Sequence, residues 1–297
     1  MIPPRVSSNS GWRGVVWAVV LALAAHTASA EILIKNGEEV GFLGDSITAS
    51  GWGNPAGYVK LVVAGLAANG VKIEPAPAGI GGHKSNNLLN RLDRDVLSKK
   101  PQWMTLSCGV NDVLQGKKGV PLNDAQAAAT TYEKSIPSEP EKGTFESNIT
   151  QIVDRAQAAG VKVIILTTTV IEEDLASREN QQLVPYNDFL RRLAIERQLP
   201  LADLNALFRE KIKAANQPKK NVFTTDGVHM NTEGNKLMAI GVLRTMGLDD
   251  DQIQRAREAW LPLETLEAEI AKRAAEAKAR LDAEKAARDA ALVAPAK

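Results

Sequence analysis

The chain has 297 residues, enough for one large domain or two small ones around a substantial core. Its 36 Lys and Arg residues nearly balance 35 Asp and Glu, and no face is obviously basic, which argues against a nucleic-acid partner. One cysteine, Cys108, leaves no internal disulfide possible. It lies at the end of an apolar run, so we expect a small buried side chain rather than a nucleophile.

The first 30 residues are typical of an export signal. Arginines precede an apolar run over residues 14–25, and Ala-Ser-Ala at residues 28–30 has the small-x-small pattern of a cleavage site. The run is too short to span a bilayer comfortably, and an uncleaved membrane anchor is the alternative. We therefore expect a signal peptide over residues 1–30, cleaved near Ala30. The mature protein would be periplasmic or secreted and would have no stable membrane span.

After the signal, short apolar runs alternate with helical patterns. In chain order the sequence predicts a strand at 40–43, a helix at 58–68, a strand at 71–73, a helix at 86–97, a strand at 103–106, a helix at 145–159, a strand at 161–166, a helix at 181–197, a strand at 199–202 and a helix at 232–246. This alternation predicts a parallel sheet with helices on both faces. Sites in such folds lie beyond the carboxyl ends of the strands.

Two segments depart from this pattern, which we assign to a domain over residues 31–248. Residues 115–143 contain three prolines and an Ala-rich middle, and predict an inserted loop with one short helix. Residues 249–297 are rich in Ala, Glu, Lys and Arg and predict a helical tail with a thin apolar stripe. A solvated helix lying on the domain is the favoured interpretation, because Ala adds little apolar area. A contact with a partner or an oligomer is the alternative.

Histidine is scarce, because only His83 and His229 remain beyond the signal. With one cysteine and two distant histidines, a metal site has little support, and we expect none. Asp226 stands three residues before His229, on a turn that contains Gly227. A carboxylate so close can accept the Nδ1 proton of the imidazole and orient the ring. An ordinary loop histidine beside a surface aspartate explains this motif alone equally well.

Three further motifs each follow a predicted strand. Ser46 lies in Gly-Asp-Ser-Ile, residues 44–47, after the first strand. The glycine-rich residues 79–83 follow the second strand and fit neither the phosphate-loop nor the dinucleotide pattern. Their free N–H groups suit an anion, including a reaction oxyanion. Asn111, in residues 109–112 after the third strand, offers an amide donor. Each motif alone is also explained by a simple turn.

Together, and in this order, the four blocks resemble those of the SGNH hydrolase superfamily, the GDSL esterases and lipases. The resemblance covers about residues 38–247. It implies a three-layer α/β/α sandwich with a central parallel sheet, a flavodoxin-like fold, here followed by a C-terminal helical extension. It also implies hydrolysis of carboxylic esters through an acyl-enzyme, with no cofactor and no metal.

The resemblance also implies roles for single residues. Ser46 would be the nucleophile, His229 its general base and Asp226 the residue that orients His229. The backbone N–H groups of Ser46 and Gly82 and the side-chain amide of Asn111 would form the oxyanion hole. His83, beside Gly82, is a candidate substrate contact, with a plain loop histidine as the alternative.

The leading hypothesis is an exported serine esterase for short-chain or acetyl esters, with acetylated carbohydrate as a candidate substrate. A lipase or lysophospholipase acting on lipid esters is the first alternative. A non-catalytic carbohydrate-binding relative is the second, and the intact set of motif residues argues against it. A scaffold that acts through its C-terminal helix is the third.

Overall fold

The computed structural model describes Met1 and residues 31–134, 139–216 and 221–293. Apart from Met1, the predicted signal peptide lies outside the described residues, so export stays a prediction. No helix within these ranges is long and apolar enough to cross a membrane.

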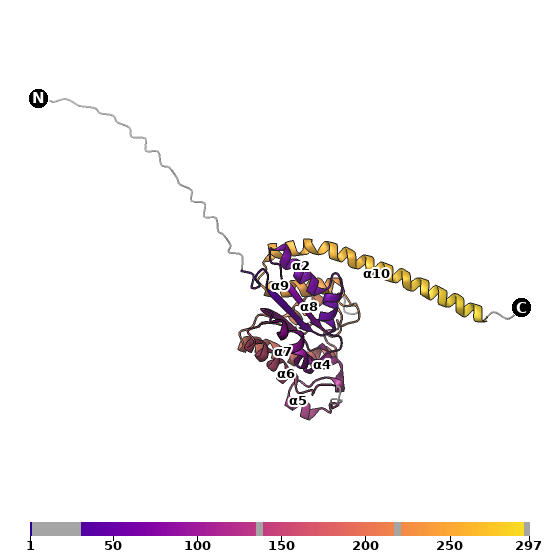
Figure 1. The fold of residues 1–297 in the computed structure, drawn as a ribbon, viewed down its shortest axis with the longest axis horizontal. Helices are drawn as coiled ribbons and strands as arrows, with labels where there is room; N and C mark the ends of the chain where they lie inside the picture. Colours follow the sequence, from indigo (N-terminus) through magenta and orange to yellow (C-terminus); the bar gives the residue numbers. More distant parts are fainter. Residues whose placement is uncertain (2–30, 135–138, 217–220, 294–297) are drawn as a thin grey trace.

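A parallel sheet forms the centre of the molecule (Figure 1). Its five strands are β1 (Glu39–Gly44), β2 (Glu74–Gly79), β3 (Trp103–Ser107), β4 (Lys162–Leu166) and β5 (Leu201–Ala202). They lie in the order β2-β1-β3-β4-β5, and every pair of neighbours is parallel. This flavodoxin-like order reverses between β1 and β3, and ligands bind such sheets beyond the carboxyl ends of the strands at that point.

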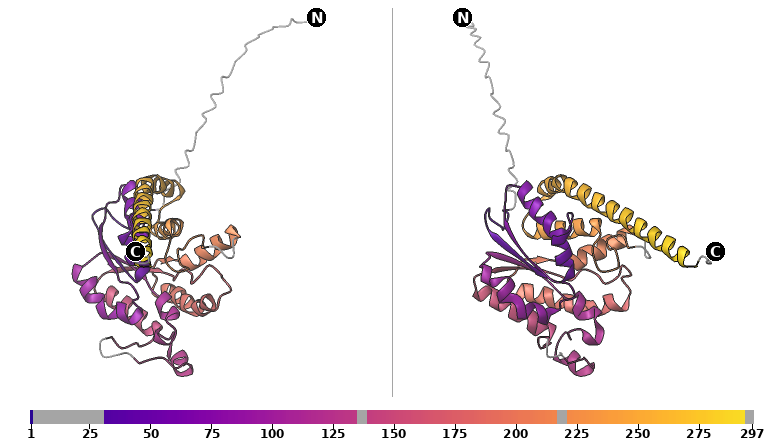
Figure 2. Two further views of the ribbon diagram at one scale, coloured as in Figure 1. Left: turned by 90° about the vertical axis from the view of Figure 1, so that its right-hand side faces the viewer. Right: turned by 45° about the vertical axis from the view of Figure 1, so that its right-hand side comes forward.

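Helices cover both faces of the sheet, which confirms the predicted three-layer fold (Figure 2). One layer contains α2 (Tyr58–Ala68), α8 (Leu204–Ala215), α9 (Thr232–Thr245) and the start of α10 (Asp250–Val293). The other contains α3 (Ser85–Asp95), α6 (Phe145–Ala158) and α7 (Arg178–Glu196). The short elements are α1 (Ser46–Gly53), α4 (Val110–Leu114), α5 (Asp124–Ala129) and two 3₁₀ turns, η1 (Leu97–Lys99) and η2 (Gly116–Lys118). The apolar core lies between these layers.

The prediction of a strand over residues 71–73 is wrong, because the second strand, β2, begins at Glu74. Pro75 and Pro77 make this segment look unlike a strand in the sequence, because proline lacks the N–H that a central strand needs. Within the described part of the chain, β2 is an edge strand that pairs with β1 alone. Proline is tolerated at a sheet edge, where the missing donor can face away from the sheet.

Three helices, α1, α4 and α8, are absent from the sequence prediction. The omission of α1 matters most, because Ser46 begins this helix instead of lying in an open turn. The eight residues of α1 include two glycines and the β-branched Ile47 and Thr48, all poor helix formers. Tertiary contacts with α2 and β2 stabilise it where local propensity does not.

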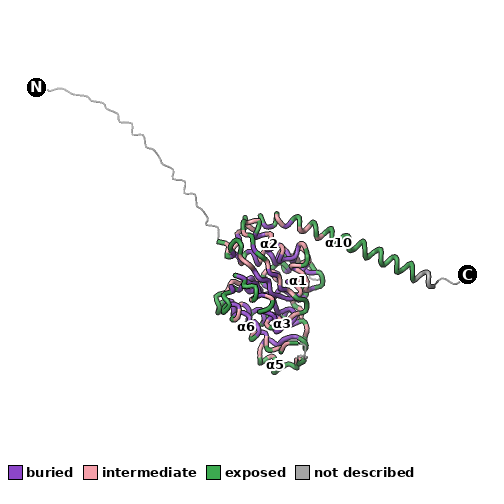
Figure 3. The backbone as a smooth tube through the Cα atoms, viewed as in Figure 1, coloured by how far each residue is buried: buried purple, intermediate pink, exposed green. Residues whose placement is uncertain are grey.

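The C-terminal segment is helical, as predicted, and α10 has two contrasting parts. Its first turns bury Ile253, Ala256 and Trp260 against α2 and α9. The Trp260 indole N–H donates to the Leu61 carbonyl at 2.8 Å. Residues 268–288 are exposed and project beyond the body of the domain (Figure 3). The first turns of α10 are thus part of the folded body, and the partner role of the rest stays a prediction.

We expect Trp260→Ala to lower the free energy of unfolding by about 3–5 kcal/mol, because it removes a fully buried indole and leaves a cavity. Leu266→Ala, on the same helix but 47% exposed, should change it by about 0.5 kcal/mol or less. Urea unfolding of both variants measures the difference. Equal losses in the two variants would contradict the anchoring role of Trp260.

Candidate active site

Ser46 is the first residue of α1, and only Asp45 separates it from the end of β1. Its backbone N–H therefore has no acceptor within the helix, like the other N–H groups of a first helical turn. The Asp45 carboxylate accepts the N–H of Ile47 at 2.9 Å and caps the helix. Ser46 thus presents both its hydroxyl and a free N–H at the positive end of a helix dipole.

The loop before α9 brings a histidine and an aspartate to this serine. His229 Nε2 lies 2.9 Å from Ser46 Oγ, and His229 Nδ1 lies 2.7 Å from Asp226 Oδ2. A carboxylate can only accept, so Nδ1 carries the ring proton and Nε2 accepts the serine hydroxyl. The contacts predicted between these residues are present, across a sequence separation of 183 positions for the Ser46–His229 pair.

Asp226 is held as a carboxylate. Partial burial raises its pKa, but hydrogen bonds outweigh this effect and lower the pKa to about 2. The donors are the His229 ring and the backbone N–H groups of His229 and Val228, the last two at 2.8 and 3.0 Å from Oδ1. The carboxylate therefore keeps its charge at any pH above about 3, where it can stabilise an imidazolium.

Glu173, which the sequence analysis did not identify, holds the start of the same loop. Its buried carboxylate accepts the backbone N–H groups of Val222, Phe223 and Thr224 at 2.7–2.9 Å, and also the Thr224 hydroxyl. A single glutamate in a connecting segment gives no sequence signal for this role. The segment that leads into Asp226 is thereby held by an acceptor from the connection between β4 and α7.

The glycine-rich loop after β2 lies directly against Ser46. A Cβ atom at Gly81 would stand 3.9 Å from the Ser46 Cβ, and one at Gly79 would stand 2.2 Å from the Ala49 nitrogen. Gly82 has φ +75°, a conformation that favours glycine. Its N–H has no acceptor within the described residues, and its carbonyl accepts from Gln115 Nε2 at 2.9 Å. This loop can therefore offer an N–H to an oxyanion.

Asn111 lies in the first turn of α4, beyond the end of β3, and is buried. Its side-chain amide donates to the His83 carbonyl at 3.0 Å. An amide has two N–H groups, so one stays available while the other fixes the orientation of the side chain. The predicted oxyanion donors, Ser46, Gly82 and Asn111, thus all follow strands that end at the same edge of the sheet. Their roles stay predictions.

A second acidic residue lies behind Ser46. Asp45 is almost fully buried, and burial raises the pKa of its carboxyl to about 7, despite the hydrogen bond from Ile47. The nearby Asp112 carboxyl raises it further. Burial also raises the pKa of Asp112, which accepts the Ser85 hydroxyl and backbone N–H. Cys108 is buried beside Asp112, as expected for an inert thiol.

The raised pKa of Asp45 makes stability depend on pH. Between pH of about 4 and about 7 the folded chain binds more protons at Asp45 than the unfolded chain. The free energy of unfolding therefore falls as the pH rises through this window, by about 4 kcal/mol at most from this group. Asp45→Asn keeps an oxygen for the Ile47 N–H but has no carboxyl group to titrate. We therefore expect the free energy of unfolding of this variant to fall less steeply with pH.

Urea unfolding between pH 5 and pH 8 measures this difference. Asp112 is present in both proteins, and because its carboxyl interacts with that of Asp45, the difference in slope reports the titration of the pair. Equal slopes for Asp45→Asn and the unmodified chain would contradict the prediction.

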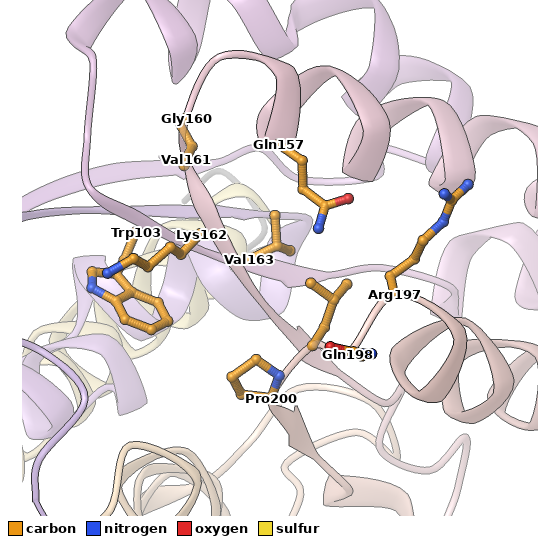
Figure 4. A pocket seen from close by; sticks show the side chains of 10 residues that line it. Trp103, Gln157, Gly160, Val161, Lys162, Val163, Arg197, Gln198 and Pro200 are labelled. Carbon is orange, nitrogen blue, oxygen red and sulfur yellow. The ribbon is translucent and has the colours of Figure 1, made fainter.

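A cavity of about 470 Å³ lies at the opposite edge of the sheet (Figure 4). Trp103 and Lys162, which line it, are the first residues of β3 and β4, whereas Ser46 and Asn111 follow the carboxyl ends of their strands. The Lys162 ammonium lies 4.8 Å from the centroid of the Trp103 ring. Among the residues that the structure describes, no serine, histidine or carboxylate lines this cavity, so it is separate from the candidate site.

The chain is similar to known esterases. Residues 42–237 match the GDSL-like lipase/acylhydrolase family. An acetylxylan esterase of Geobacillus stearothermophilus is 25% identical over 228 residues, which cover 73% of this chain and 97% of that protein. The crystal structure of Axe2, an acetylxylan esterase from that organism, matches with a TM-score of 0.58 at 25% identity, over 73% of this chain and 97% of Axe2. The structure of the acetyl xylan esterase AlAXEase matches at 29% identity and a TM-score of 0.56, over 69% of this chain and 98% of that chain.

The family match covers well over half of the chain, and it spans the segments that hold Ser46, Gly82, Asn111 and the Asp226–His229 pair. The fold also agrees with that of the similar esterases. The chain therefore belongs to the GDSL-like lipase/acylhydrolase family and is an ester-hydrolysing serine hydrolase.

Proposed function

We propose that this protein is an exported esterase that removes acetyl groups from carbohydrate, with Ser46 as its nucleophile. The assignment of Ser46 as the nucleophile is supported by the hydrogen-bonded contacts from Asp226 through His229 to the Ser46 hydroxyl. The proposed substrate is supported by the similarity to two acetylxylan esterases. The proposed export is supported by the N-terminal sequence.

The first half of the reaction forms the acyl-enzyme. Ser46 Oγ attacks the acyl carbonyl carbon while His229 Nε2 takes the hydroxyl proton. The carbonyl oxygen becomes negative and accepts hydrogen bonds from the N–H groups of Ser46 and Gly82 and from the Asn111 amide. The bond from the carbonyl carbon to the alcohol oxygen then breaks, and His229 gives its proton to the leaving alcohol.

The second half releases the acid. A water molecule attacks the acyl carbon and gives a proton to His229 Nε2, and the same donors stabilise the second oxyanion. The bond to Ser46 Oγ breaks, and the proton on His229 returns to the serine oxygen. Asp226 stays charged throughout and stabilises the imidazolium in both halves.

Acetate release from acetylated xylooligosaccharides tests the proposed substrate. A parallel series of 4-nitrophenyl esters from acetyl to dodecanoyl, together with a lysophospholipid, measures the preference for acyl length. We expect kcat/KM to be highest for acetyl and acetate to be released from the oligosaccharide. An optimum at long acyl chains would contradict the proposal and favour the lipase or lysophospholipase alternative.

Export is tested separately, by N-terminal sequencing of the protein recovered from its native compartment. We expect a mature chain that begins near Glu31, outside the cytoplasm. A chain that retains residues 1–30 in the membrane fraction would instead indicate an uncleaved anchor.

A further inference from the structure

Arg91 is a charged residue in the interior of the protein. It lies on α3, and its side chain is only 2% exposed. Burying a guanidinium costs several kcal/mol unless its N–H groups find acceptors. Here Nε donates to His83 Nδ1 at 3.1 Å, Nη2 donates to the Gly44 carbonyl at 2.7 Å, and Nη1 donates to the Ala78 carbonyl at 2.8 Å and to Asp95 at 2.9 Å. These four bonds use nearly all of its donors.

The acceptors of Arg91 lie on the segments that build the candidate site. Gly44 is the last residue of β1, two positions before Ser46. Ala78 belongs to β2, just before the glycine-rich loop, and His83 directly follows Gly82. One planar guanidinium therefore ties the strand that carries the nucleophile to both ends of the loop that carries an oxyanion donor.

The bond from Arg91 also determines the tautomer of His83. A guanidinium can only donate, so His83 Nδ1 must present its lone pair. The ring is then neutral and carries its proton on Nε2. That nitrogen has no hydrogen-bond partner within the described residues, and the side chain is half-buried beside Gly82. His83 thus has one free N–H at the edge of the site.

Burial and the nearby positive charges both favour the neutral form of this ring. Burial lowers the pKa of His83, and the positive charge of Arg91 lowers it further. Arg94 and Lys84 act in the same direction, whereas Asp95 raises the pKa. Protonation would also place a second donor on Nδ1, opposite the Arg91 Nε–H, and break the hydrogen bond.

We propose that Arg91 is a positioning residue that holds the glycine-rich loop against the nucleophile strand and fixes His83 as a neutral Nε2–H donor to an oxygen of the bound ester. The role of Arg91 in holding the loop depends only on the hydrolysis of an ester, not on which ester is the natural substrate. The contact of His83 with substrate rests on the proposed function, because an acetylated sugar supplies the oxygen acceptors.

Kinetics of Arg91 variants on 4-nitrophenyl acetate test the loop-holding part, since this activated ester has no sugar. We expect Arg91→Met and Arg91→Lys to lower kcat at least about 30-fold and to change KM less than about threefold. The loss falls on kcat because an oxyanion donor acts mainly in the transition state. We expect the Lys variant to be as impaired as the Met variant, because a single ammonium group cannot reach acceptors on three segments as the planar guanidinium does.

Arg94→Met is the matched control. Arg94 is on the same helix and bonds the same Asp95, but its side chain is 72% exposed and makes no hydrogen bond to the loop within the described residues. We expect its kcat within twofold of the unmodified protein. A folded Arg91→Met variant whose kcat stays within threefold would overturn the loop-holding role.

A spectroscopic measurement keeps the inference testable even where Arg91 variants do not fold. In the protein labelled with ¹⁵N-histidine, long-range ¹H–¹⁵N spectra report the tautomer of each ring, and His83→Gln assigns the His83 signals. We expect the neutral ring to carry its proton on Nε2 and its pKa to lie below the ordinary value. A proton on Nδ1, or titration near the ordinary value of about 6.5, would overturn the tautomer assignment.

His83 variants test the donor to substrate. Gln retains an oxygen for Arg91 and an N–H group, whereas Leu has neither. On an acetylated xylooligosaccharide we expect His83→Gln to keep kcat/KM within about threefold and His83→Leu to lose about tenfold or more. Equal values for the two variants would overturn the donor role. If the oligosaccharide is not hydrolysed while 4-nitrophenyl acetate is, the proposed substrate fails, and the Arg91 comparison still decides the loop-holding part.

Discussion

Replacement of Ser46 by alanine is expected to lower kcat for 4-nitrophenyl acetate by at least about 10⁴-fold. Without Oγ no acyl-enzyme can form, and His229 loses the group that it would deprotonate. Because nucleophile and base act as one unit, the Ser46→Ala and His229→Ala changes combined should cost about as much as either alone. Steady-state hydrolysis by the three variants measures both effects.

Ser50→Ala is the matched control, because Ser50 lies one turn further along α1 and its hydroxyl makes no hydrogen bond within the described residues. Its kcat should stay within twofold of the unmodified protein. A fluorophosphonate should label the protein once, and the label should be lost in Ser46→Ala. Labelling of another serine, or undiminished turnover by Ser46→Ala, would show that the nucleophile lies elsewhere.

The second large effect concerns Asn111. We expect Asn111→Ala to lower kcat about 100- to 1000-fold with a small change in KM, because the amide stabilises the oxyanion more than the ground-state carbonyl. Asn111→Asp has nearly the same shape but places acceptor oxygens where the oxyanion and the His83 carbonyl need donors. Its loss should therefore exceed that of the alanine variant.

Thermal unfolding separates a catalytic loss from a folding defect in the Asn111 variants. It is the necessary control, since Asn111 is buried and also anchors the His83 carbonyl. A folded Asn111→Ala variant that keeps more than about a third of the unmodified kcat would remove this amide from the oxyanion hole.

Periodicity in the sequence was sufficient for the long, regular elements. The helix over residues 58–68 and the strand beginning at Trp103 lie where the apolar pattern predicts them. The edge strand β2 was misplaced because its prolines are tolerated only at an edge, and a strand's place in the sheet is a tertiary property. The short helix α1 was missed because packing, not propensity, stabilises it.

In the candidate site, too, local sequence pattern predicted some features and tertiary packing decided others. The sequence by itself determined which groups are available: two histidines beyond residue 30, a serine after the first strand, an asparagine after the third, and an aspartate three residues before His229. These choices depend on chemical type and local spacing, which a linear pattern records.

Only the tertiary structure decided how these groups are held in place. Glu173 fixes the loop that carries Asp226 and His229, and Arg91 joins the ends of β1 and β2. Glu173 lies 49 to 51 positions before the groups it contacts, and Arg91 lies 47 positions after Gly44 and 13 after Ala78, so no local spacing rule connects them. Their importance arises from burial, because a polar group removed from water must find partners, and most of those partners are backbone groups that the fold brings close.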